Sequence, residues 1–148
     1  MDFVFVEQPD HKAMLVAWLM ERIPTFPPPP NEASFQGAVM LSGDRIVAGC
    51  AYHRYADRFK GIEVTFAADN PMWCRPGNVE KWFAYPFDQL GCERITMTIA
   101  RRNKRARVMA KKMGFREEGI ARKGFYPDDA VIYGLLRTDQ AAGKYIGG

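Results

Sequence analysis

Basic side chains crowd residues 92–119, a segment that predicts a β-branched strand, an asparagine and a short helix. The strand covers residues 94–100, and the helix covers residues 104–113. Asn103 can cap the helix through its side-chain oxygen, and Gly114 stands where a helix needs a left-handed stop. A helix N-terminus that points out of a sheet binds anions. The nearby cations are Arg101, Arg102, Lys104, Arg105 and Arg107. The segment therefore predicts either an anion site or a solvated basic helix face.

Three other side chains could move a proton. Glu63 lies in the middle of a predicted strand, opposite that strand's apolar residues, and burial strengthens a carboxylate as a base. The alternative is a solvent-facing Glu63 paired with Lys60 or Arg54. His53 titrates naturally near neutrality, although a lone histidine near a strand end is also commonly structural. Tyr133 could donate a proton from its hydroxyl, or it could serve only in packing across the last strand.

The composition is that of an ordinary globular protein, with 148 residues of which 47% are apolar and 26% are charged. We expect a single domain over residues 1–139, followed by a flexible tail over residues 140–148. The sequence predicts no membrane-spanning segment and no signal peptide, which favours a cytoplasmic protein. Three cysteines without a C-x-x-C pair and two histidines predict no metal site.

The predicted elements alternate in an order that defines the fold class. Strands are expected over residues 3–7, 36–42, 46–54, 61–67, 94–100, 116–122 and 130–137, and helices over 10–23, 77–90 and 104–113. Pro86 should kink the second helix or remove one of its hydrogen bonds. A helix–strand–helix crossover among hairpins predicts an α+β fold with a mixed, mostly antiparallel sheet of six to seven strands. One pair of strands should be parallel, and a crevice opens where such neighbours part.

Two strings resemble the GNAT superfamily of N-acetyltransferases. The first joins Asn103, the small residue Ala106, Met113-Gly114-Phe115 and Glu118-Gly119 at the family's spacing. The second, residues 83–91, resembles a helix of the ribosomal-protein (RimJ/RimL-like) branch. Together with the order of elements, the resemblance covers roughly residues 3–138. It implies a GNAT-like sheet whose parallel pair forms a cofactor cleft.

The resemblance also implies an activity and a set of site residues. Acetyl-CoA would be the donor, and a primary amine of a small molecule, a protein N-terminus or a lysine would attack it directly in a ternary complex. Glu63 would be the leading base and His53 the second, with Tyr133 as a substitute acid. The implied cofactor-binding residues are Thr65, Phe66 and Ala67 along pantetheine, Arg75, Gly77, Asn78 and Val79 at the pyrophosphate, Asn103 at pantetheine and Arg107 near the 3′-phosphate. The acceptor cleft would be formed by residues 22–36, 52–60 and 122–130.

Two departures from the family pattern keep other functions open. The phosphate segment 75–79 has a single glycine and a proline, and Ala110 stands where many members carry an acidic tyrosine. A catalytically degenerate module on the same scaffold is therefore one alternative. The basic patch favours a second alternative, a protein that binds or modifies nucleic acid. Pairing through an edge strand would give a homodimer.

Overall fold

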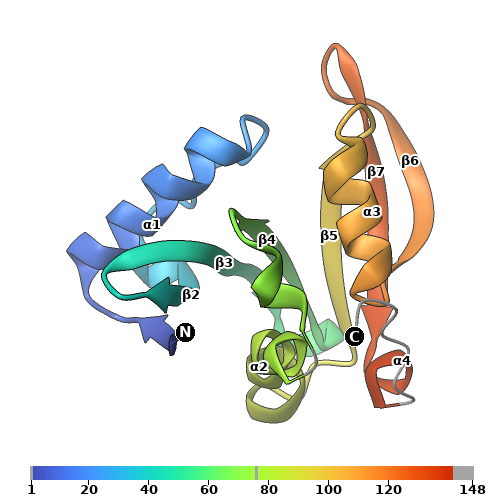
Figure 1. Cartoon of the computed structure of the whole chain (residues 1–148). Helices are drawn as coiled ribbons and strands as arrows, with labels where there is room; N and C mark the ends of the chain where they lie inside the picture. Colours follow the sequence, from blue (N-terminus) through green and yellow to red (C-terminus); the bar gives the residue numbers. More distant parts are fainter. Residues whose placement is uncertain (1, 76, 142–148) are drawn as a thin grey trace.

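A seven-stranded sheet runs through the described part of the computed structural model, which comprises residues 2–75 and 77–141 (Figure 1). The strands are β1 (Asp2–Val6), β2 (Phe35–Ser42), β3 (Arg45–Ala56), β4 (Gly61–Ala68), β5 (Arg94–Ala100), β6 (Arg116–Phe125) and β7 (Asp128–Leu136). Their order across the sheet is β1-β2-β3-β4-β5-β7-β6. Within these residues only β4 and β5 pair in parallel. The predicted mixed sheet with one parallel pair is therefore confirmed.

The helices occupy the predicted places in the chain. They are α1 (Pro9–Arg22), α2 (Asn78–Ala84), α3 (Lys104–Lys112) and α4 (Arg137–Ala141), with short turns η1 (Glu32–Ser34), η2 (Asp57–Phe59) and η3 (Pro71–Cys74). Gln140 and Ala141, assigned in the prediction to a tail, lie in α4, and residues 142–148 lie outside the described residues. In the part of the chain that the structure describes, no helix has the length and apolar character needed to cross a bilayer.

Two apolar layers hold helices on opposite faces of the sheet. Leu15 and Leu19 of α1 are buried in one cluster, with Phe26, Phe35 and Ala51. Gly49 lets α1 approach closely, because a Cβ atom at that position would lie 2.9 Å from a Leu15 methyl group. Because β-strand side chains alternate, neighbouring residues of β3 enter the larger cluster under α2 and α3 on the other face.

The helix after β4 changes its geometry at Pro86, as its sequence predicts. The ring has no N–H to donate to the carbonyl of Trp82, four residues earlier. That carbonyl instead accepts a 2.6 Å hydrogen bond from the hydroxyl of Tyr52 in β3. The helix continues as a π-helical turn, η4 (Tyr85–Gln89), in which the Leu90 N–H donates to the carbonyl of Tyr85. The proline therefore ties this helix to the centre of the sheet.

Candidate active site

The parallel pair β4 and β5 is joined over only three register positions, and then the two strands part. The last matched residues are Glu63 and Thr96. Beyond them β4 still pairs with β3, whereas β5 pairs with β7. A cavity of about 210 Å³ lies at this divergence. Its wall includes residues 63–66 of β4 and residues 96–100 of β5. The crevice predicted between parallel neighbours is therefore present.

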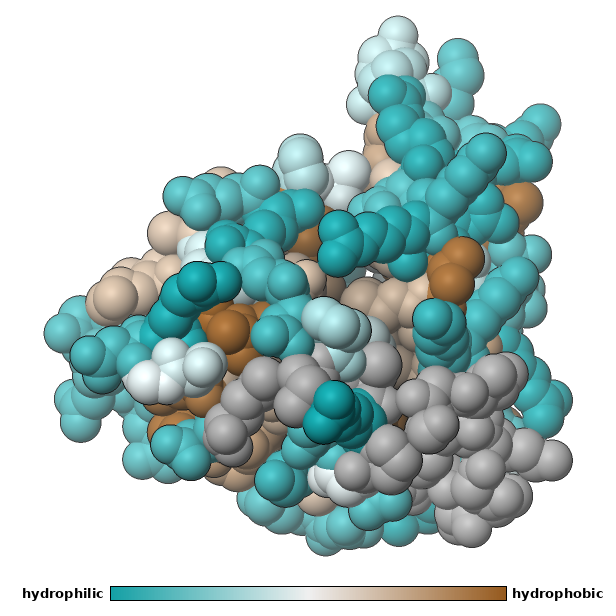
Figure 2. Space-filling model, in the orientation of Figure 1, coloured by the Kyte–Doolittle hydropathy of each residue, from teal (hydrophilic) through white to brown (hydrophobic). Residues whose placement is uncertain are grey.

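The cavity reaches both faces of the sheet. Ile23, Phe26 and Pro27, which follow α1, line it on one face. Asn103, Ala106 and Met109, from the start and body of α3, line it on the other face. Figure 2 shows the surface hollowed between the part that carries α1 and the part that carries α3, with hydrophobic atoms surrounded by hydrophilic ones. A ligand that enters beside α3 can thus meet one that enters beside α1.

Glu63 and His53 lie opposite each other in the β3–β4 register, and both line the cavity. Oε2 of Glu63 is 3.3 Å from Nε of Arg54 and 4.0 Å from Nδ1 of His53. The same oxygen is buried and has no hydrogen bond of good geometry within the described residues. A partly buried carboxylate that keeps one oxygen unsatisfied inside a cavity is suited to receive a donor from a ligand. Both interpretations of Glu63 hold in part, because it faces the cavity and also pairs with Arg54.

His53 is an uncharged ring in this setting. Burial lowers its pKa from 6.5 to about 4, and the charge of Arg54 lowers it further. Its Nε2 atom is 2.8 Å from Oγ1 of Thr65, and its ring lies 6.0 Å from that of Phe26. At neutral pH the imidazole can therefore donate or accept a hydrogen bond without carrying a charge.

The residues assigned to pantetheine mostly gather at the cavity. Thr65, Phe66 and Asn103 line it, whereas Ala67 packs in the apolar cluster under α1. Asn103 also caps α3 as predicted, because its Oδ1 accepts a 3.1 Å hydrogen bond from the N–H of Ala106. Asn103 thus joins the start of α3 to the cavity wall.

The residues assigned to the pyrophosphate lie outside this wall, at the start of α2. Gly77 has φ +86°, a conformation that favours glycine. The amides of Asn78 and Val79 both donate to the carbonyl of Arg75, at 2.9 Å and 3.3 Å. Val79 is buried in the core, and Pro76 lies outside the described residues. The turn at this helix start is therefore closed by the chain's own carbonyl.

Arg107 and Tyr133 bind each other instead of lining the cavity. Tyr133 is fully buried, and its hydroxyl accepts a 3.1 Å hydrogen bond from Nε of Arg107. The other nitrogens of Arg107 donate to the Arg101 carbonyl and to Glu117. Packing, the alternative that the sequence left open for Tyr133, describes its position. Arg107 joins α3 to β6 and β7.

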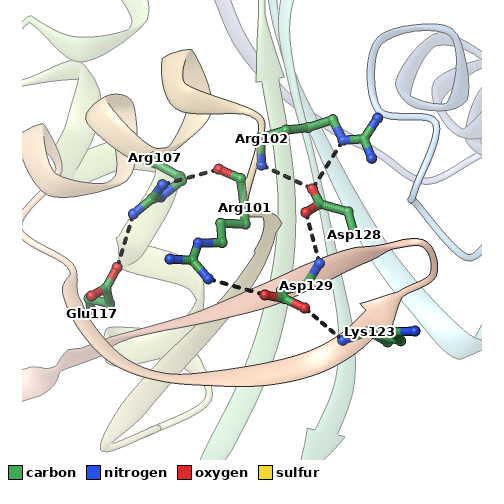
Figure 3. A network of polar contacts seen from close by, with 7 residues as sticks. All are labelled: Arg101, Arg102, Arg107, Glu117, Lys123, Asp128 and Asp129. Carbon is green, nitrogen blue, oxygen red and sulfur yellow. Dashed lines mark hydrogen bonds and ion pairs between the residues drawn. The ribbon is translucent and has the colours of Figure 1, made fainter.

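Two aspartates that the charge count of the basic patch omitted lie against it (Figure 3). Asp129 accepts from the Arg101 guanidinium at 3.1 Å, and Asp128 accepts from both the N–H and Nε of Arg102. The hydrogen bond from the Arg102 N–H lowers the pKa of Asp128, and that from the Lys123 N–H lowers the pKa of Asp129. These contacts fasten the segment before α3 to the tip of the β6–β7 hairpin.

Sequence reasoning missed the contribution of β5 to the cavity. Thr96, Met97 and Thr98 line it, as do Ile99 and Ala100. The available signal was the expected crevice between parallel strands, which has two walls. The predicted acceptor segments fared better, since each of them contributes to the lining through Phe26, Arg54 and Phe125.

This geometry is the GNAT acetyltransferase fold, a mixed sheet whose single parallel pair among the described residues splays around a cavity. The spermidine/spermine N-acetyltransferase SpeG of Vibrio cholerae, solved in mutant form, superposes with a TM-score of 0.74 at 11% identity. That match covers 96% of this chain and 99% of the other. An acetyltransferase structure from T. thermophilus matches with a TM-score of 0.68 at 19% identity, over 97% of this chain and 90% of that one.

A similarity in sequence points the same way. The chain is 33% identical over 88 residues to a Bacillus subtilis (strain 168) protein named "Putative ribosomal N-acetyltransferase YdaF". The match covers 57% of this chain and 43% of YdaF, so it spans less than half of that relative. No family model matches the chain. The GNAT resemblance carried by residues 83–119 is thus confirmed for the fold.

Proposed function

We propose that this chain transfers the acetyl group of acetyl-CoA to a primary amine. The observation that carries the proposal is the opening between β4 and β5, with the carboxylate of Glu63 facing it on one side and Asn103 on the other. An acyl donor and an amine that enter from opposite faces would be held together there. Positioning of this kind can alone supply effective molarities on the order of 10⁵ M.

The residues beside α3 suit the pantetheine arm of acetyl-CoA. Residues 65–67 of β4 have no partner on the β5 side, so the edge of the strand can exchange hydrogen bonds with the amides of the arm. Ala106 and Met109 offer apolar surface, and Asn103 offers an amide. When bound, acetyl-CoA would supply a thioester whose carbonyl carbon the amine attacks, with a C–N bond formed and the C–S bond broken.

The phosphates of the donor would lie near exposed cations at the start of α3. Lys104 and Arg105 are exposed in the first turn of that helix. The pKa of Asp69, at the end of β4, is lowered by its hydrogen bond with Arg22 and further by the charges of Arg45 and Arg105. The end of β4 and the start of α3 therefore share a positive field, which favours phosphate.

Glu63 would receive the proton of the attacking amine. Its Oε2 atom is buried without a good hydrogen bond, so an ammonium or amine would satisfy it. Neutral His53 lies 4.0 Å from the same oxygen and would steady it without competing for the proton. A general base of this kind typically contributes a factor of about 10²–10⁴ in rate.

The absence of a tyrosine at position 110 does not preclude the reaction. Ala110 is fully buried in the core under α3. A thiol has a pKa of about 8.5, so a thiolate can depart near neutral pH with little help from an acid. This argument favours an active enzyme over a degenerate module. The nucleic-acid alternative loses support because Arg101, Arg102 and Arg107 are engaged in ion pairs.

Calorimetry and a thiol-release assay test the proposal together. Acetyl-CoA should bind the protein at micromolar to millimolar concentration, and primary amines should cause release of free CoA in proportion to enzyme. Absence of binding at millimolar acetyl-CoA would rule the proposal out. Binding without thiol release from any amine of a broad panel would favour the degenerate module.

A further inference from the structure

Arg54 occupies an unusual backbone position at the cavity. It lies in a bulge of β3, where the register with β4 shifts between His53 and Ala56. Its φ is +52°, in the left-handed region that side chains other than glycine seldom adopt. From this position Nε of Arg54 reaches to 3.3 Å from Oε2 of Glu63, and the side chain lines the cavity. Such outliers cluster at sites of function.

The outer nitrogens of the Arg54 guanidinium are available to a ligand. The side chain is 68% exposed, and its ion pair with Glu63 uses Nε. Among the described residues, no partner accepts from the two terminal nitrogens of Arg54. A guanidinium fork matches a carboxylate with two parallel hydrogen bonds. The cavity therefore offers an anion-binding group directly beside the carboxylate proposed to receive the amine.

The rest of the acceptor side is uncharged and largely apolar. Ile23, Phe26 and Pro27 form one wall, and Phe125 contributes from the β6–β7 hairpin. Among the described residues, Glu63 is the single carboxylate of the lining, and Arg54 balances its charge. A polyamine would bring second and third ammonium groups that meet no second carboxylate in this described wall, which makes it a poor fit.

We infer that the acceptor is a small amine with a carboxylate next to its amino group, for which a free apolar amino acid is the simplest example. This inference rests on the proposed acetyl transfer and names its substrate class. The amino group would face Glu63, the carboxylate would bind the terminal nitrogens of Arg54, and the side chain would contact Phe26 and Phe125. A peptide that begins with aspartate presents similar chemistry and is a second source of it.

Matched acceptors test the role of the carboxylate. L-leucine, L-leucinamide, spermidine and a C-terminally amidated Asp-Leu peptide would be compared by CoA release and by calorimetry with the CoA-saturated protein. We expect kcat/KM for leucine or for the peptide to exceed that for leucinamide and spermidine at least tenfold. The more active of leucine and the peptide identifies the source. Equal or faster turnover of leucinamide or spermidine would overturn the inference while leaving acetyl transfer intact.

Arg54 variants test the residue itself. In Arg54→Gln the preference for leucine over leucinamide should fall to about onefold, with the change in KM, and spermidine should gain because Glu63 is no longer neutralised. Arg54→Gly, which suits the positive φ, should behave alike and guards against misfolding. Arg58→Gln, an exposed arginine on η2, is the control and should keep the preference. A preference retained in both Arg54 variants would overturn the assignment.

The two proposals fail in distinguishable ways. If no amine releases thiol, yet leucine binds the CoA-saturated protein and leucinamide does not, acetyl transfer is wrong and the carboxylate site stands. If neither leucine nor the peptide binds at all, the inference about the acceptor is wrong whatever happens to other amines.

Discussion

Nε2 of His53 lies 2.8 Å from Oγ1 of Thr65, so a candidate base and a candidate cofactor-binding residue share a hydrogen bond on neighbouring strands. Both residues lie on the α1 face of the sheet, next to Glu63. The contact fixes the orientation of the ring, and burial keeps the ring uncharged by lowering its pKa to about 4. His53 is thereby better suited to position Glu63 than to act as a base at neutral pH.

Replacement of Glu63 by glutamine should remove the proton acceptor with little change in shape. We expect kcat for amine acetylation to fall about 100-fold, while the Kd for acetyl-CoA stays within about twofold of the wild-type value. CoA release and calorimetry measure these two quantities. Glu7→Gln, at an exposed position just after β1, is the control. An unchanged kcat in Glu63→Gln would remove Glu63 from the chemistry.

His53 should make the free energy of unfolding depend on pH. Its folded pKa of about 4 is below its ordinary value of 6.5, so between these values the unfolded chain binds more protons. The stability that the neutral ring contributes is present above pH 6.5 and is lost as the pH falls toward 4, by on the order of 3 kcal/mol. Urea unfolding at several pH values measures this slope.

Two substitutions separate the His53 contribution from that of other titrating groups. His53→Gln should flatten the loss of stability between pH 6.5 and pH 4, relative to the wild type. His11→Gln, at an exposed position in α1, should leave the slope unchanged. A slope that is identical in wild type and His53→Gln would contradict the burial of a neutral ring.

Arg107 and Arg105 should have opposite roles although they are two residues apart on α3. Arg107→Ala removes the donors to Tyr133, Glu117 and the Arg101 carbonyl, so Tm should fall while the Kd for acetyl-CoA changes little. Arg105→Ala removes an exposed cation near the end of β4, so Kd should rise several-fold with Tm unchanged. Calorimetry and thermal unfolding report both. The reverse pattern would return Arg107 to the 3′-phosphate role that the GNAT resemblance implied.

Tyr52→Phe should destabilise the fold through a single carbonyl. The hydroxyl of Tyr52 is the donor that satisfies the Trp82 carbonyl left free by Pro86. Loss of this donor in a buried place should cost about 1–3 kcal/mol in the free energy of unfolding. Tyr55→Phe is the matched control, because its hydroxyl bonds Asp57 at the surface, where water can replace it. Equal stability of the two variants would contradict this account of Pro86.

The local features of α3 and its surroundings could be predicted because short-range chemistry determines them. The cap at Asn103, the left-handed Gly114 and the helical change at Pro86 all follow from what one side chain or ring does to its nearest backbone groups. The functions of Arg107 and Tyr133 could not be predicted in this way. Their hydrogen bond joins residues 26 positions apart, and it depends on how α3 lies against β7.

The sequence by itself determined the order of strands and helices, the single crossover that makes β4 and β5 parallel, and the presence of a carboxylate on β4. Periodicity and turn chemistry act over a few residues, so they are legible in the chain. The tertiary structure decided where β4 and β5 part, which cations are paired with Asp128 and Asp129, and that Arg54 bulges toward Glu63. These outcomes depend on packing and charge between segments distant in sequence, and a local pattern carries no record of such contacts.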